Sequence, residues 1–218
     1  MTVLIRKWFL LSLLFIVPLV VGAQTKEIYV NPDFARLTQD EKTLAILPFE
    51  VTMNLRPKQK ARITAGELAD LEHKEAFAIQ SALQTYFLKR KEKRHFSVDF
   101  QDIQQTNALL KQKHLLPDSL SFYSPAEQAR ILGVDGVVSG ALVSDKPLSD
   151  GASIALGLLV GFSGPTNSGK CTISIHDRDS GKLVWKYDKT LSRGLGSDIN
   201  TIINAIMRKA SRKFPYEK

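Results

Sequence analysis

Residues 164–171 come closest to a known chemical motif. They read Gly-Pro-Thr-Asn-Ser-Gly-Lys-Cys, which nearly matches the Gly-x-x-x-x-Gly-Lys-Ser/Thr pattern of a phosphate-binding loop. Cys171, however, stands where that loop needs a hydroxyl for magnesium, and residues 172–176 alternate like a strand. In a true phosphate-binding loop a helix follows, because its first amide groups hold the phosphates. We therefore expect a turn that leads into a strand, and no bound nucleotide.

Other side chains that could do acid–base or metal chemistry are scattered. None of the four histidines is at metal-ligand spacing with another or with Cys171; they are His73, His95, His114 and His176. His176 precedes Asp-Arg-Asp, but charged residues are usual where a strand meets a turn. We expect no catalytic residue, no cofactor and no metal site. The alternative is a secreted hydrolase or small-ligand-binding protein in which His176 and carboxylates converge in a cleft.

The first 24 residues have the pattern of an export signal. Arg6 and Lys7 form a basic start, residues 9–21 are an apolar run, and small residues at 21–23 precede Gln24. The run has the length of a signal-peptide core and is short for a membrane span. We expect a signal peptide at 1–23 and a periplasmic or secreted product, with association with the outer membrane left open. The alternative is an uncleaved anchor.

Composition indicates a basic globular chain. Of the 218 residues, 44% are hydrophobic and 24% are charged, which is ordinary for a folded domain. Loss of Arg6 and Lys7 with the signal lowers the formal net charge from +8 to +6. Cys171 is the only cysteine and lies far from the leader. Neither an intramolecular disulfide nor a lipoprotein of the usual bacterial pattern is therefore expected.

Hydrophobic periodicity predicts alternating strands and helices. Strands are expected at 43–49, 95–100, 134–143, 172–176 and 183–191, of which the last two form a hairpin. Helices are expected at 67–91, at 102–113 after the cap Asp102, at 124–133 and from about 197 to 214. Ser124 and Glu127 have the spacing of a capping box, and Gly133 can end that helix.

This order predicts an α/β fold. We expect a single layered domain at 43–218, with a mixed β-sheet on which the long helix and a C-terminal helix pack. Residues 24–42 are expected to form an extended lead-in, and residues 51–66 are basic and irregular in pattern.

Two surfaces are candidates for interactions. One is the apolar island 154–162, because loops are usually polar; its residues are Leu156, Leu158, Leu159, Val160 and Phe162. Alternatively, this island packs on the core. The other surface is a basic patch that consists of Lys58, Lys60, Arg62, Lys89, Arg90, Lys91, Lys93 and Arg94. Cations at 89–94 equally suit the negative end of a helix dipole.

The order of these segments resembles a known superfamily. Lys-Thr-Leu-Ala-Ile-Leu-Pro-Phe at 42–49, Ala-Arg-Ile-Leu-Gly-Val-Asp-Gly-Val-Val-Ser-Gly at 129–140 and the hairpin at 175–185 are similar to segments of one α/β domain. Curli-secretion (CsgG-type) proteins, penicillin-binding-protein activators and TolB N-terminal-like domains share that domain. The resemblance implies a non-enzymatic envelope domain that binds other proteins or assembles into rings. This chain departs from the lipoprotein members because it lacks their lipid-bearing cysteine.

The sequence therefore predicts an exported, non-catalytic cell-envelope protein that acts by protein–protein contact or self-assembly. Peripheral membrane contact is a further expectation, whereas nucleic acid and nucleotide are not expected as partners. Binding of a polyanion or a membrane surface is a weaker alternative, which the basic composition suggests.

Export is testable directly. We expect the chain, expressed with a C-terminal tag in a bacterial host, to leave the cytoplasm and to begin at Gln24. N-terminal sequencing of the fractionated protein checks this. A chain that keeps Met1 and stays with the inner membrane would show an uncleaved anchor instead.

Overall fold

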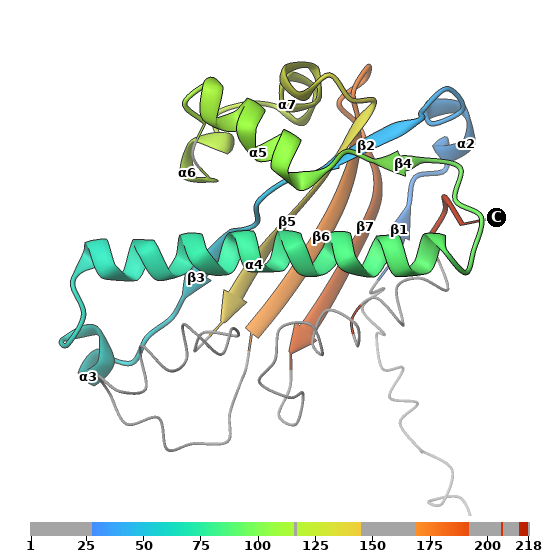
Figure 1. Cartoon of the computed structure of the whole chain (residues 1–218). Helices are drawn as coiled ribbons and strands as arrows, with labels where there is room; N and C mark the ends of the chain where they lie inside the picture. Colours follow the sequence, from blue (N-terminus) through green and yellow to red (C-terminus); the bar gives the residue numbers. More distant parts are fainter. Residues whose placement is uncertain (1–27, 116, 145–168, 192–205, 207–213, 218) are drawn as a thin grey trace, which may run out of the picture.

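The computed structural model describes residues 28–115, 117–144, 169–191, 206 and 214–217 (Figure 1). The apolar island 154–162, the leader and most of the expected C-terminal helix lie outside these residues. The described elements are β1 (Ile28–Val30), α2 (Phe34–Leu37), β2 (Thr43–Ile46), β3 (Glu50–Met53), α3 (Pro57–Lys60), α4 (Ala65–Lys91), β4 (Asp99–Phe100), α5 (Ile103–Gln112), α6 (Pro117–Leu120), α7 (Pro125–Leu132), β5 (Gly136–Ser144), β6 (Gly169–Asp177) and β7 (Leu183–Leu191).

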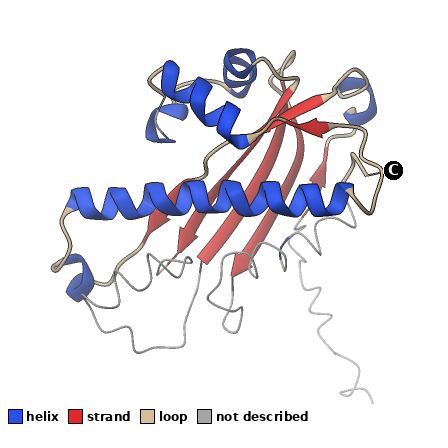
Figure 2. Cartoon of the chain, in the orientation of Figure 1, coloured by secondary structure: helices blue, strands red, loops and turns tan. Residues whose placement is uncertain are grey.

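The predicted α/β fold with a mixed sheet is confirmed. The strands lie in the order β1-β7-β6-β5-β2-β4, and β3 pairs with β5 outside this path. Pairing is parallel among β2, β3, β4 and β5, whereas β5–β6, β6–β7 and β1–β7 are antiparallel. Helix α4 runs across one face of the sheet, and α5, α6 and α7 gather near one end of the strands (Figure 2).

Helix α4 forms as its sequence predicts. Thr64 and Glu67 make a reciprocal capping box at its start, which satisfies amide groups that the first turn leaves unpaired. Apolar residues at three- and four-residue steps then face the sheet, among them Ile79, Leu83 and Phe87. They join buried strand residues such as Val138 in the main core. A second core lies beneath α5 and α7.

Several local predictions are confirmed at the level of individual caps. Asp102 accepts hydrogen bonds from the first turn of α5, and Ser124 forms the expected capping box with Glu127 at the start of α7. Gly133 ends α7 in the left-handed conformation, at φ 67°. Residues 177–182 turn the β6–β7 hairpin, and Trp185 is fully buried in β7.

Some of the strands differ in their boundaries from those predicted from the sequence. The strand expected at 43–49 ends at Ile46, and residues 50–53, expected to be irregular, form β3. Pro48 explains the break because it has no N–H for a strand ladder. The strand expected at 95–100 is reduced to β4, and the described part of the lead-in, 28–42, contains β1 and α2. β1 is a short edge strand whose place is set by pairing with β7.

Strands β2 and β3, which Pro48 separates, both pair with β5. β2 pairs with Gly136–Val138 of β5, and β3 pairs further along with Ala141–Ser144. Between them Phe49 leaves the sheet, and its N–H donates to the carbonyl of Ala76 in α4 at 3.4 Å. The Phe49 ring lies against Gly140, where a Cβ would overlap both the ring and the Thr172 carbonyl. Only glycine fits this position without movement.

None of the helices in the described part of the chain combines the length and hydropathy that a membrane crossing requires.

A pair of glycine substitutions tests the Phe49–Gly140 contact. We expect Gly140→Ala to lower the free energy of unfolding by about 1–3 kcal/mol, because the methyl group overpacks the core. Gly66→Ala is the control, since a Cβ there meets nothing within 4 Å. That change should be neutral or stabilise the helix by up to about 1 kcal/mol. Urea unfolding measures both, and equal stabilities would contradict the packing described.

Candidate functional site

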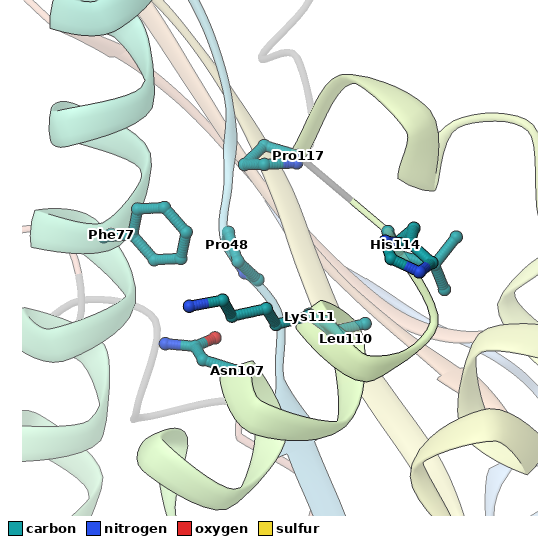
Figure 3. Close-up of a pocket in the computed structure, with 8 residues that line it drawn as sticks. Pro48, Phe77, Asn107, Leu110, Lys111, His114 and Pro117 are labelled. Carbon is teal, nitrogen blue, oxygen red and sulfur yellow. The ribbon is translucent and has the colours of Figure 1, made fainter.

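A pocket opens between α4 and α5, beside the break between β2 and β3 (Figure 3). Its volume is about 470 Å³, which lies within the range of small-molecule and side-chain binding sites. We name it the Phe77 pocket. Its lining consists of Pro48, Phe77, Asn107, Leu110, Lys111, His114, Leu115 and Pro117.

A buried amide pair sets the distance between the two helices. Gln80 of α4 donates from Nε2 to the carbonyl of Ile46 at 2.7 Å and to Oδ1 of Asn107 at 3.0 Å. Asn107 of α5 returns a hydrogen bond from Nδ2 to Oε1 of Gln80 at 3.0 Å. Gln80 is fully buried, so its loss would leave polar groups unpaired. The pair therefore fixes α5 beside α4 and holds the pocket walls in place.

The inner surface of the pocket is apolar. Leu110 and Leu115 belong to the second core and are almost fully buried. Pro48 and Pro117 contribute rings and no N–H groups. Phe77 projects from α4 toward Pro48 in Figure 3, and 41% of its surface is exposed. A large aromatic side chain thus remains partly in water beside a hollow that could receive another apolar group.

Lys111 is the cationic side chain at the rim on the α5 side. Lys111 extends from α5 toward α4, and His114 lies at the opposite end of the pocket from Phe77 (Figure 3). Both are exposed, and no carboxylate is among the residues that line the pocket. His114 has a φ of 54°, in the left-handed region, just after α5 ends. The turn that follows a helix commonly uses this conformation.

A second hollow, which we name the sheet groove, adjoins the Phe77 pocket. The two share Pro48 and Pro117. The sheet groove encloses about 600 Å³ and is lined by residues of β3, β5 and β6, by residues at and near α6 and α7, and by Glu72 of α4. Its lining includes the carboxylates of Glu50 and Glu72 and many hydroxyl groups, from Thr52, Ser121, Tyr123, Ser139, Thr172 and Ser174. The two adjoining hollows therefore carry opposite charge.

The predicted basic patch is divided between the two ends of α4. Lys58, Lys60 and Arg62 lie at or beside α3, before α4 begins, whereas residues 89–94 lie where α4 ends (Figure 1). A helix of 27 residues separates them by about 40 Å. Arg90 and Arg94 pair with Glu217 at 3.2 Å, and Lys91 pairs with Asp99. Polyanion binding stays a prediction.

The other predicted interaction surface, with Leu156, Leu158, Leu159, Val160 and Phe162, lies outside the described residues. Its role also stays a prediction.

The segment around His176 is used for structure. Burial lowers the pKa of His176, whose Nδ1 atom is buried without a hydrogen-bond partner. Asp177, next to it on the strand, accepts hydrogen bonds from the N–H and hydroxyl of Ser180 in the hairpin turn. Arg178 pairs with Asp135 at 3.0 Å. His176 is not among the residues that line either hollow.

Cys171 is likewise a structural residue. It lies in β6 with 1% of its surface exposed, and burial raises the pKa of its thiol to about 12. The thiolate form that acts as a nucleophile is therefore scarce at neutral pH. The residues after the loop-like motif form a strand, as expected. Residues 164–168 of the motif lie outside the described part of the chain.

The Phe77 pocket was not predicted from the sequence. A signal was present, since Phe77 is apolar but lies off the stripe that Ala76, Ile79 and Leu83 form on α4. Phe77 is thus an exposed aromatic side chain on the side of α4 that faces away from the main core. The shape of the pocket could not be read from the sequence, because Pro48, α4 and α5 meet only in the fold.

A buried carboxyl near the end of the sheet was also missed. Tyr216 donates a hydrogen bond from its hydroxyl to Oε2 of Glu41 at 2.5 Å, and Oε1 of Glu41 is buried without a partner. Burial raises the pKa of Glu41 to about 7, and the charges of Asp177 and Asp135 add to this effect. This contact holds residues 214–217 against the sheet.

The raised pKa of Glu41 predicts a pH-dependent stability. Because the folded chain holds this proton up to about pH 7 and the unfolded chain only to about pH 4.5, the stabilisation is complete below pH 4.5. It falls as the pH rises through 7, by about 2 kcal/mol after allowance for screening. Glu41→Gln should remove this part of the pH dependence. Urea unfolding between these pH values measures it, and parallel profiles for both chains would contradict the assignment.

Comparisons with known proteins show likeness at the level of the fold. No protein-family model matches the chain, and no curated protein is similar to it in sequence. Lipoprotein GNA1162 from Neisseria meningitidis is similar over 78% of this chain and 99% of its own, with a TM-score of 0.44 and 10% identity. The LpoB C-terminal domain from Salmonella enterica is similar over 74% of this chain and 94% of its own, with a TM-score of 0.35 and 13% identity. A PelC dodecamer from Paraburkholderia phytofirmans is similar over 84% of this chain and 90% of its own, with a TM-score of 0.33 and 12% identity. All three of these similarities are at 10% to 13% identity and have TM-scores below 0.5.

Proposed function

We propose that this chain is an exported, non-catalytic protein of the cell envelope that binds another polypeptide through the Phe77 pocket. The observation that carries the proposal is a preformed apolar hollow beside an aromatic side chain that is 41% exposed. Burying the rest of Phe77 against an inserted side chain removes apolar surface from water, which favours association. Aromatic anchors in such pockets supply much of the binding energy at protein interfaces.

The rigid setting of the pocket supports this function. Phe77 lies near the middle of α4, whose opposite side is packed into the main core. The facing wall is tied to α4 by the pair of hydrogen bonds between Gln80 and Asn107. A pocket that is already formed costs little conformational entropy when a partner binds.

Export to the envelope rests on the sequence. The basic start, apolar run and small residues before Gln24 are typical of a cleaved signal. The motifs at 42–49, 129–140 and 175–185 resemble those of envelope domains. Self-assembly is included in the proposal, since the inserted side chain can come from a second copy of the chain.

Binding of a small molecule is a second candidate function. The volume of the Phe77 pocket, about 470 Å³, is sufficient for a drug-sized molecule. An experiment on the pocket must therefore separate a polypeptide from a small ligand.

Photocrosslinking in living cells tests the proposed function. We expect a photoreactive benzoyl-phenylalanine in place of Phe77 to give one discrete adduct with a polypeptide in the exporting host. The matched control places the same residue at Leu88, which is also on α4 and is 49% exposed. Mass spectrometry identifies the polypeptide in the adduct.

A loss-of-contact variant completes this experiment. The identified polypeptide should copurify with the Leu88→Asp chain and not with the Phe77→Asp chain. Equal adducts at both positions, or an adduct of small-molecule mass at position 77, would contradict the proposed function.

A further inference from the structure

We propose that the polypeptide held by the Phe77 pocket has an apolar anchor with an acidic residue on one side and a basic residue on the other. This inference rests on the proposed function and adds the chemistry of the partner. It follows from the charges of the two adjoining hollows and from the proline residues between them.

The α5 end of the pocket carries a positive charge at Lys111. Lys111 and His114 are exposed there, and the part of the chain that the structure describes gives neither side chain an ion-pair partner. Lys111 reaches toward the space in front of Phe77 (Figure 3). A carboxylate on the partner next to its apolar anchor would therefore meet a cation that has no competing acid among the lining residues.

The sheet groove carries the opposite charge. Glu50 lies on β3 and is exposed. Glu72 lies on α4, where its Oε1 atom accepts a hydrogen bond from the N–H of Met53 at 2.7 Å. The lining of the sheet groove contains no lysine or arginine among the described residues. A lysine or arginine of the partner is the complementary group for this end.

The two hollows meet at two proline residues. Pro48 and Pro117 line both of them. Since proline has no N–H, neither residue can donate a backbone hydrogen bond to an added strand. Their backbones offer only carbonyl acceptors at this crossing. The complementary group here is an apolar side chain against the proline and phenylalanine rings, with charges on either side. A segment that crosses from the pocket to the groove thus needs acid, anchor and base in that spatial order.

Selection from a random peptide library tests this order. The full chain with a C-terminal tag is immobilised, and displayed twelve-residue peptides are selected against it. The same selection is run on Lys111→Glu, on Glu50→Lys and on the control Lys60→Glu, whose lysine lies on α3 away from both hollows. Binding of each selected peptide is then measured on the Phe77→Asp and Leu88→Asp chains.

We expect peptides with a large apolar residue between an acidic and a basic residue. Selection on Lys111→Glu should replace the acid with lysine or arginine, and selection on Glu50→Lys should replace the base with an acid. The original peptides should bind Lys111→Glu about fivefold to tenfold more weakly, with a loss that shrinks at high salt because these charges are exposed. Lys60→Glu should select the original pattern.

Two results would overturn different parts of the proposal. Peptides that need Phe77 but show no charge preference, or the same preference on Lys111→Glu, would refute the inferred partner chemistry and leave the proposed function standing. If Phe77→Asp and Leu88→Asp bind the selected peptides equally well, the pocket is not a polypeptide site. The proposed function would then fail together with the inference.

Discussion

The contact between the Phe49 ring and Gly140 is the constraint on which the arrangement of this molecule depends. β5 accepts β2 along its first half and β3 along its second half on the same side. Leu47 still donates its N–H to the carbonyl of Val138 in β5 at 2.9 Å. The ladder then breaks at Pro48, which has no N–H to donate. Phe49 then fills the space over the backbone of β5, where the absence of a side chain at Gly140 provides room.

The same break creates the surface that we assign to binding. Pro48 is a buried residue between the two strands and forms part of both hollows. Helix α4 packs over the main core, and α5 is held beside it by the hydrogen bonds of Gln80 and Asn107. The apolar floor of the Phe77 pocket is therefore an open edge of the second core. Leu110 and Leu115 thus belong both to the second core and to the lining of the pocket.

Charge is distributed according to burial. Lys111 at the rim of the pocket and Glu50 in the sheet groove are exposed. Near the end of the sheet, Glu41 is buried with Tyr216 and holds its proton to about pH 7. That contact joins residues 175 positions apart in the chain. It attaches residues 214–217 to the sheet whose edge is formed by β1.

The sequence alone determined where the helices begin and end, because these boundaries depend on residues close together in the chain. The caps at Asp102 and Ser124, the stop at Gly133 and the long helix were predictable because each uses contacts within about one helical turn. The order of these elements also indicated the α/β class. Only the tertiary structure decided that β3 pairs with β5, that Glu41 meets Tyr216, and that Phe77 faces a pocket. Each of these depends on packing between distant segments, where a four-residue strand or a single exposed phenylalanine has no periodic signal of its own.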